Sequence, residues 1–238
     1  MAKRSNRFIV VNTLRKVHKN LGRFIAPLLP SGKFLWRMIA QNGEYLFHRT
    51  SDWRPTEDFS QRNAELFDNF GFRPDSFVGK TIIDIGAGSR LITIYFKDAK
   101  IIAIEPLAQR FLKTLSWCDL HKAHKIYSTP AEKMISELKG IADVVISINV
   151  LDHCYNFEAI IKNIKAYLKP GGLAFLSFDS HTDRTDLMHP LILTPEKCEC
   201  IFRQEGFLVE KFTVGLNPQE KTYAGGKALN YWLKKASG

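Results

Sequence analysis

The stretch Thr81-Ile-Ile-Asp-Ile-Gly-Ala-Gly88 decides the fold of this chain. Its first five residues form an apolar, β-rich run, and a glycine turn follows at once. An apolar run of this kind fits a strand buried on both faces of a parallel sheet, and ligands bind beyond the carboxyl ends of such strands. Glycine lets a ligand lie against bare backbone at that turn. The stretch therefore predicts the first strand of an α/β sheet and a ligand-binding turn after it.

Further apolar runs alternate with helical patterns downstream, which predicts an α/β fold with a doubly wound, mostly parallel sheet. Two strands near the C-terminus are expected to form an antiparallel pair at the end of this sheet. The predicted strands cover residues 81–85, 101–105, 125–127, 144–148, 173–178, 207–214 and 228–233. The predicted helices cover residues 90–97, 108–118, 131–139, 157–168 and 195–205, with Asn156 and Thr194 as N-caps of the last two.

Residues 1–78 are expected to form a basic N-terminal helical extension and cap, and residues 79–238 the sheet domain. Helical patterns cover residues 10–28, 34–41 and 56–70 of the extension, and Asn42-Gly43 is expected to end the second of them. No stretch approaches the roughly 20 uncharged apolar residues that a membrane-spanning helix needs.

Most of the net charge of +10 lies at the front of the 238-residue chain. Residues 1–43 carry nine basic residues and no acidic one, which leaves 25 basic and 24 acidic residues in the rest. A nucleic-acid-binding protein more often carries its basic patch on the folded domain, so nucleic acid is the less favoured partner. The four cysteines form no CxxC pair, which indicates a reducing, cytoplasmic compartment.

The basic front segment, residues 7–28, has a single apolar stripe at helical spacing. Three interpretations stay open: the helix packs on its own domain, it lies peripherally on the anionic inner face of a membrane, or it is a targeting presequence. The stripe is formed by Val10, Leu14, Val17, Leu21, Phe24 and Leu28.

Two acidic residues define the expected ligand. Asp84 lies two residues before the first glycine, where a carboxylate would repel a pyrophosphate but suits a cationic ammonium or sulfonium group. Glu105 lies 17 residues after Gly88, at the end of the second strand, where it can accept hydrogen bonds from both hydroxyls of a ribose. Leu91 stands where a dinucleotide motif has its third glycine, which argues against a dinucleotide.

The chain resembles the class I S-adenosylmethionine-dependent methyltransferases, of types 11 and 12, in four ordered motifs between about residues 80 and 180. The motifs are Asp84-Ile-Gly-Ala-Gly88, Ile104-Glu-Pro106, Thr129-Pro-Ala-Glu132 and Ser147-Ile-Asn-Val-Leu-Asp-His153. The resemblance implies a Rossmann-like fold, the cofactor S-adenosyl-L-methionine, and cofactor contacts from Asp84, Gly86, Ala87, Gly88, Glu105, Pro106, Ala131, Glu132, Asn149 and Val150. Arg90 departs from the family pattern, since a third glycine usually stands there; it either meets the carboxylate end of the ligand or makes a loop contact.

The candidate catalytic residues are His153, just past the fourth strand, and His181, in the polar run from Asp179 to His189 after the fifth. No metal is expected, because Asp152, Asp179, His181 and Asp183 have no spacing that enforces coordination. The resemblance also implies that residues 45–54 close over the cofactor, with candidate contacts from Tyr45, His48, Trp53 and Arg54.

These features predict methyl transfer from S-adenosylmethionine to an oxygen or nitrogen of a small molecule or glycan. The loop after the fifth strand loosely resembles methyltransferases of bacterial surface-polysaccharide pathways, and a lipid-linked sugar would suit an interfacial front helix. Two alternatives stay open: an RNA or protein methyltransferase that uses the basic arm, and a non-catalytic, membrane-associated subunit of the same fold.

Overall fold

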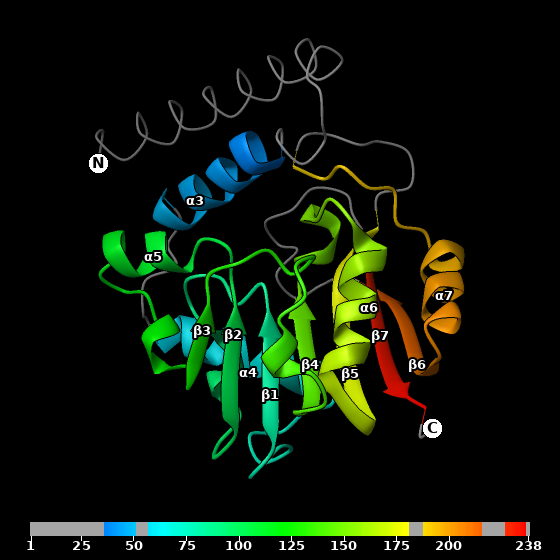
Figure 1. Ribbon diagram of the computed structural model, residues 1–238. Coiled ribbons are helices and arrows are strands. Elements are labelled where there is room, and N and C mark those ends of the chain that lie inside the picture. The colour runs from blue at the N-terminus through cyan, green and yellow to red at the C-terminus, as the bar shows by residue number, and fades with distance from the viewer. Residues whose placement is uncertain (1–35, 51–56, 181–187, 216–226, 237–238) are drawn as a thin grey trace, which may run out of the picture.

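The computed structural model describes residues 36–50, 57–180, 188–215 and 227–236, and its centre is one seven-stranded sheet (Figure 1). The strand order is β3-β2-β1-β4-β5-β7-β6. Strands β1 to β5 are parallel, and β7 runs antiparallel to both β5 and β6. The predicted doubly wound, Rossmann-like sheet is confirmed. The strands are β1 Thr81–Ile85, β2 Lys100–Ile104, β3 Lys125–Tyr127, β4 Ala142–Ile148, β5 Leu168–Ser180, β6 Phe207–Gly215 and β7 Lys227–Lys235.

Helices cover both faces of the sheet, because successive strand residues point to opposite sides. On β1, Ile82 joins one apolar cluster with Phe67 of α4, whereas Ile83 and Ile85 join another with residues of α6 and α7. The α-helices are α3 Gln41–Thr50, α4 Glu57–Asn69, α5 Ala108–Thr114, α6 Phe157–Tyr167 and α7 Pro195–Gln204. Shorter turns are the π-helical η2 Trp36–Ala40 and the 3-10 elements η3 Ile92–Tyr95, η4 Leu120–Lys122, η5 Ser136–Leu138 and η6 Leu151–His153.

Both predicted N-caps are confirmed. The Asn156 side chain accepts a hydrogen bond from the Ala159 amide at the start of α6, and Thr194 does the same for the Lys197 amide at the start of α7. Such caps satisfy backbone donors that a helix leaves unpaired at its first turn.

The helix predicted over residues 90–97 is wrong, since only the 3-10 turn η3 forms there. Three consecutive β-branched residues, Ile92 to Ile94, disfavour an α-helix. Tertiary contacts hold the turn instead: the Thr93 hydroxyl donates to Asp84 on β1, and the Asn63 side chain donates to the carbonyl of Ile92.

The helix predicted over residues 131–139 is also wrong, and η5 is its only regular turn. Side chains of α6 take the backbone groups that a helix would use. Asn163 donates to the carbonyl of Ala131 (2.8 Å), and the hydroxyl of Tyr167 accepts from the amide of Ile135 (3.0 Å). The helix predicted over 108–118 forms but ends at Thr114.

Asn42-Gly43, predicted as a break, lies inside α3, so the extent 34–41 predicted for this helix is wrong. A Cβ atom at Gly43 would lie 2.6 Å from the sulfur of Met188, in the segment after β5. The glycine therefore admits a close contact between α3 and that segment. Figure 1 shows α3 lying across the carboxyl ends of the parallel strands.

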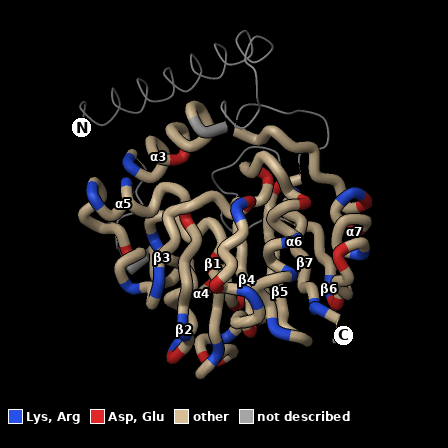
Figure 2. Tube along the Cα trace, in the orientation of Figure 1, with Lys and Arg blue, Asp and Glu red and all other residues tan. Residues whose placement is uncertain are grey.

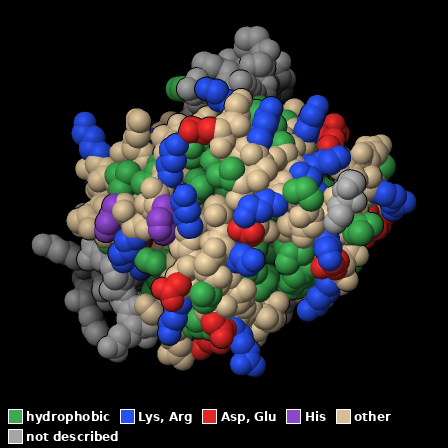
Figure 3. Space-filling view, turned by 60° about the horizontal axis from the view of Figure 1, so that its bottom comes forward, with side chains coloured by type: hydrophobic (Ala, Val, Ile, Leu, Met, Phe, Trp, Pro, Cys, Tyr) green, Lys and Arg blue, Asp and Glu red, His purple; other side chains and the backbone are tan. Residues whose placement is uncertain are grey.

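Basic and acidic residues are interspersed along the described part of the chain (Figure 2). The face at the opposite end of the sheet from α3 likewise mixes Lys and Arg with acidic and apolar side chains (Figure 3). Residues 7–28, for which an amphipathic helix is predicted, lie outside the described residues. Among the helices that are described, none combines the length and apolar character needed to cross a membrane.

Candidate active site

The glycine turn after β1 lies where the strand order reverses, between β1 and β4, and an open α/β sheet has its ligand crevice at this point. Gly86 and Gly88 have φ angles of +73° and +60°, which favour glycine. A Cβ atom on Gly86 would lie 2.3 Å from Val150, in the loop after β4. The turn and this loop therefore meet through bare backbone, which brings two of the predicted cofactor motifs together.

Asp84 is buried beside this turn, with 3% of its surface exposed. The Thr93 hydroxyl donates to its Oδ2 atom at 2.5 Å. Burial raises the pKa of Asp84 to about 7, although the hydrogen bond from Thr93 acts in the opposite direction. A cation placed near this carboxylate would favour its ionised form, as the sequence predicts for a sulfonium or ammonium ligand.

Glu105, at the end of β2, fixes the shape of the glycine turn. Its two carboxylate oxygens accept from the amides of Gly88 (3.0 Å) and Leu107 (2.8 Å). Burial raises its pKa to about 7, with a further contribution from the charges of Glu44 and Asp84, and these together outweigh the two backbone hydrogen bonds. A carboxylate has about four acceptor positions, so two remain for the ribose hydroxyls. The carboxylates of Asp84 and Glu105 thus fit S-adenosylmethionine, which is cationic and carries a ribose.

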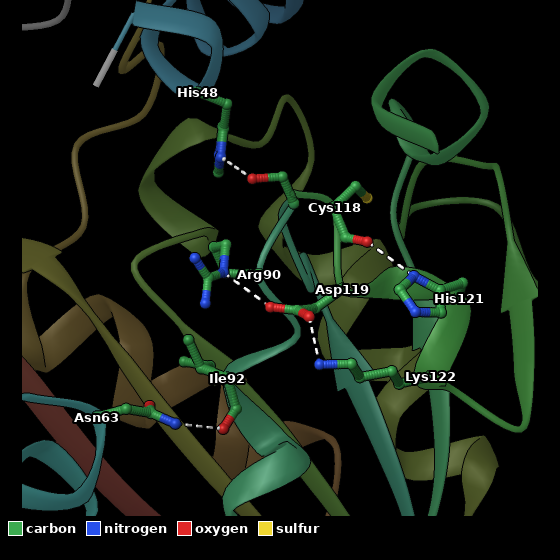
Figure 4. Close-up of polar contacts among 9 residues, drawn as sticks. His48, Asn63, Arg90, Ile92, Cys118, Asp119, His121 and Lys122 are labelled. Carbon is green, nitrogen blue, oxygen red and sulfur yellow. Dashed lines mark hydrogen bonds and ion pairs between the residues drawn. The ribbon is translucent and has the colours of Figure 1, made fainter. Parts of the chain in front are cut away.

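Arg90 makes a loop contact (Figure 4). Its Nε atom lies 2.9 Å from Asp119 Oδ2, and both side chains are largely buried. Its guanidinium also lies 4.0 Å above the ring of Phe59 on α4. The Asp119 amide donates to the carbonyl of Ser89, so side chain and backbone together tie the glycine turn to the segment before η4.

Helix α3 covers the glycine turn from above. His48 Nδ1 and Ser89 Oγ share a hydrogen bond of 2.9 Å (Figure 4), and the ring of His48 packs 4.8 Å from that of Phe111. Burial lowers the pKa of His48, despite the nearby charge of Glu44, so the imidazole is neutral at pH 7. The Tyr45 hydroxyl donates to Thr114 on α5. These contacts hold α3 over the glycine turn, and the cofactor contacts of Tyr45 and His48 stay predictions; Trp53 and Arg54 lie outside the described residues.

A second polar group gathers at the carboxyl ends of β4 and β5, and we call its residues Glu44, Asp152, His153 and His189 the acceptor-side cluster. Asp152 Oδ2 lies 3.5 Å from His153 Nε2 and 3.8 Å from His189 Nε2. Glu44 Oε1, from α3, lies 3.6 Å from His153 Nδ1. Burial acts to lower the pKa of His153, but the carboxylates of Asp152 and Glu44 outweigh it and the pKa is raised.

The remaining predicted cofactor residues follow the ends of β2, β3 and β4. Asn149 has a left-handed φ of +58°, and its amide donates to the carbonyl of Ser177 on β5. Glu132 accepts from the amide of Tyr155 at 3.0 Å, and the carbonyl of Pro106 accepts from the hydroxyl of Ser128. The predicted catalytic residue His181 lies outside the described residues. Glu44 is not among the site residues predicted from the sequence. Its position one helical turn before the candidate His48 could have indicated it.

The family model described as "Methyltransferase domain" matches residues 53–207 of the chain. Among curated proteins, the ubiquinone biosynthesis O-methyltransferase of Chromobacterium violaceum is 26% identical over 133 residues, which are 54% of this chain and 55% of that protein. The corresponding enzyme of Pseudomonas paraeruginosa is 27% identical over 135 residues, with the same two shares. The chain spans about half the length of the curated relatives it matches.

Solved methyltransferase structures share the fold. The Burkholderia thailandensis 1,6-didemethyltoxoflavin-N1-methyltransferase, solved with S-adenosylhomocysteine, superposes with a TM-score of 0.59 at 18% identity and covers 87% of this chain and 92% of its own. A putative sarcosine dimethylglycine methyltransferase of Galdieria sulphuraria gives a TM-score of 0.58 at 10% identity, over 74% and 85%. At such identities the likeness establishes the arrangement of strands and helices.

Proposed function

The chain belongs to the methyltransferase-domain family of S-adenosylmethionine-dependent enzymes, and on this premise we propose that it methylates an oxygen atom of a small hydroxylated molecule or of a glycan. The observation that carries the proposal is the acceptor-side cluster. It places two carboxylates and two imidazoles at the ends of β4 and β5, beside the loop that packs on the glycine turn.

The cofactor side needs few residues. When bound, S-adenosylmethionine supplies a methyl group that its sulfonium already makes reactive. Asp84 and Glu105 would hold the cation and the ribose, and the bare backbone of the glycine turn would allow close approach. Helix α3 would exclude water, since His48 and Tyr45 anchor it over the crevice. Positioning of this kind accounts for much of the rate acceleration in transfer reactions.

The acceptor-side cluster favours an oxygen acceptor. A hydroxyl group must lose its proton during methylation, whereas a neutral amine can attack without help. Asp152 is fully buried, and the side chains of His153 and His189 are 18% and 26% exposed, so both imidazoles can be reached from solvent. Groups that attract a proton are therefore available on the side from which an acceptor would approach.

The relatives and the distribution of charge along the chain support a small acceptor. The curated relatives are O-methyltransferases of ubiquinone biosynthesis, and the Burkholderia neighbour was solved with 1,6-didemethyltoxoflavin. Residues 1–43 carry nine basic residues and no acidic one, and the rest of the chain has 25 basic and 24 acidic residues, so that part has little net charge to attract a polyanion such as RNA.

Transfer of a labelled methyl group tests the proposal. The purified chain is incubated with labelled S-adenosylmethionine and with separate pools of small hydroxylated compounds and sugars, of RNA and of protein. We expect label in the small-molecule or sugar pool as an alkali-stable methyl ether. Label in RNA or protein would overturn the proposed acceptor. Calorimetry that detects no binding of S-adenosylmethionine would overturn the cofactor side.

A further inference from the structure

We infer that Asp152, His153 and His189 bind a divalent transition-metal ion, and that this ion holds the oxygen of the acceptor. The inference rests on the proposed function and assigns a ligand to its acceptor-side cluster. One potential ligand atom from each of the three residues lies within 4.8 Å of the other two. The set consists of two imidazole nitrogens and one carboxylate oxygen from two separate loops.

The separations fit an ion better than direct hydrogen bonds. Asp152 Oδ2 lies 3.5 Å from His153 Nε2 and 3.8 Å from His189 Nε2. Both distances exceed those of N–H···O hydrogen bonds, which are 2.7–3.2 Å. Metal–ligand bonds of about 2.0–2.2 Å place two ligand atoms of a tetrahedral or octahedral site roughly 3.0–3.5 Å apart. Small side-chain rotations would therefore bring the three atoms onto one ion.

Surrounding contacts favour the same assignment. Metal-binding histidines usually direct their second ring nitrogen at a carboxylate, which fixes the ring and raises its basicity. Glu44 is the carboxylate beside this nitrogen: its Oε1 atom lies 3.6 Å from His153 Nδ1, which is longer than a direct hydrogen bond, and a small rotation of the Glu44 side chain would bring it into reach. The rings of His153 and His189 lie 4.4 Å apart between centroids, so both converge on Asp152 from neighbouring positions. Two protonated imidazoles at this distance would repel each other, whereas two neutral ones can share an ion.

The donor set limits the kind of ion. Imidazole nitrogens suit zinc, iron and related metals, whereas magnesium and calcium prefer sites built of oxygen alone. Three protein ligands leave at least one coordination position for another molecule, as in catalytic zinc sites. An ion there would lower the pKa of an acceptor hydroxyl. The hydroxyl proton passes to solvent, the oxygen–methyl bond forms as the sulfur–methyl bond breaks, and a neutral thioether leaves.

The sequence predicts no metal, because the candidate ligands Asp152, Asp179, His181 and Asp183 are not spaced along the chain in a pattern typical of a metal site. His189 lies 36 residues after His153. Only the fold brings the two together, since β5 returns the chain to the edge of the sheet where β4 ends. This return explains why spacing alone does not reveal the site.

Cobalt spectroscopy tests the inference directly. The full chain is freed of metal with a chelator and titrated with Co²⁺, whose visible d–d absorption reports a protein site. We expect one ion per wild-type chain. His189→Gln and Asp152→Asn should lose the absorption, and Glu44→Gln should weaken Co²⁺ binding by about 10- to 100-fold. His121→Gln, at an exposed position of η4, is the matched control and should bind like the wild type.

Calorimetry with S-adenosylmethionine on the same samples separates the two hypotheses. If the cofactor binds but Co²⁺ does not, or if His189→Gln binds Co²⁺ as the wild type does, the metal inference is overturned and the proposed function stands. If the cofactor does not bind, the proposed function falls. Because Asp152 is fully buried, His189→Gln, with its partly exposed side chain, remains decisive should Asp152→Asn fail to fold.

Discussion

Gly86→Ala tests whether the contact between the glycine turn and the β4 loop shapes the candidate site. The added Cβ atom meets two penalties. A left-handed backbone conformation costs a residue with a side chain about 1–2 kcal/mol, and φ at Gly86 is +73°. The Cβ atom would also lie 2.3 and 2.4 Å from the two methyl carbons of Val150, and overpacking of this kind costs about 1–3 kcal/mol. The free energy of unfolding should fall by about 2–5 kcal/mol in total.

Gly140→Ala is the matched control, because its φ is +67° and a Cβ atom there would have no neighbour within 4 Å. It should cost only the backbone penalty of about 1–2 kcal/mol. Urea unfolding measures the loss in the free energy of unfolding for both variants, and the difference between the two losses is the cost of the contact with Val150. Combining Gly86→Ala with Val150→Ala should recover part of that difference as a coupling energy in a double-mutant cycle, because it removes the two methyl contacts but leaves the Cβ atom of residue 150 at 2.9 Å. Equal costs for the two glycine variants, or a coupling energy near zero, would refute the role of this contact.

Three further predictions follow from the buried charges around the site. Asp84→Asn should weaken binding of S-adenosylmethionine by at least about 10-fold in calorimetry, since it removes a buried charge that faces a cationic ligand. The pKa values of Asp84 and Glu105 are raised to about 7, so between about pH 4 and pH 7 the folded chain binds more protons than the unfolded one. Without cofactor, the contribution of these two groups to the free energy of unfolding should therefore fall as the pH rises through this range. The fall is up to about 1.4 kcal/mol per pH unit and group. Urea unfolding at several pH values measures this slope, and an equally steep slope in Asp84→Asn would contradict it. Arg90→Met should lower the free energy of unfolding in urea by about 1.5–3 kcal/mol, because it removes the buried partner of Asp119 and leaves only the half-exposed Lys122, whereas Lys122→Ala should cost less than about 1 kcal/mol.

The sheet and the placement of Asp84 and Glu105 around the glycine turn could be predicted from the sequence, because local patterns determine both. Apolar runs mark the buried strands, and a strand that is buried on both faces has few alternatives. Asp84 and Glu105 stand at fixed distances from the glycine turn, so strand order alone brings them to it. The contact from the Gly88 amide to Glu105 then follows from the register of β1 and β2.

The short helices could not be predicted because contacts distant in sequence decide them. Residues 131–139 have a helical pattern, yet Asn163 and Tyr167 of α6 engage their backbone. Gly43 looks like a helix break, yet it lies inside α3, where a side chain would collide with Met188. At residues 131–139 the partners lie more than 20 residues away and override local propensity, and no short window of sequence contains both partners.

Helix α3 shows why the acceptor-side cluster could be recognised only from the structure. Glu44 and His48 are four residues apart, so a continuous helix places them on one face. His48 reaches Ser89 on the cofactor side, while Glu44 reaches His153 on the acceptor side. A helix broken at Gly43 would leave Glu44 without a defined direction. The same glycine that misleads a local prediction therefore allows one helix to bound both halves of the site, and a shift of α3 would alter cofactor closure and acceptor geometry together.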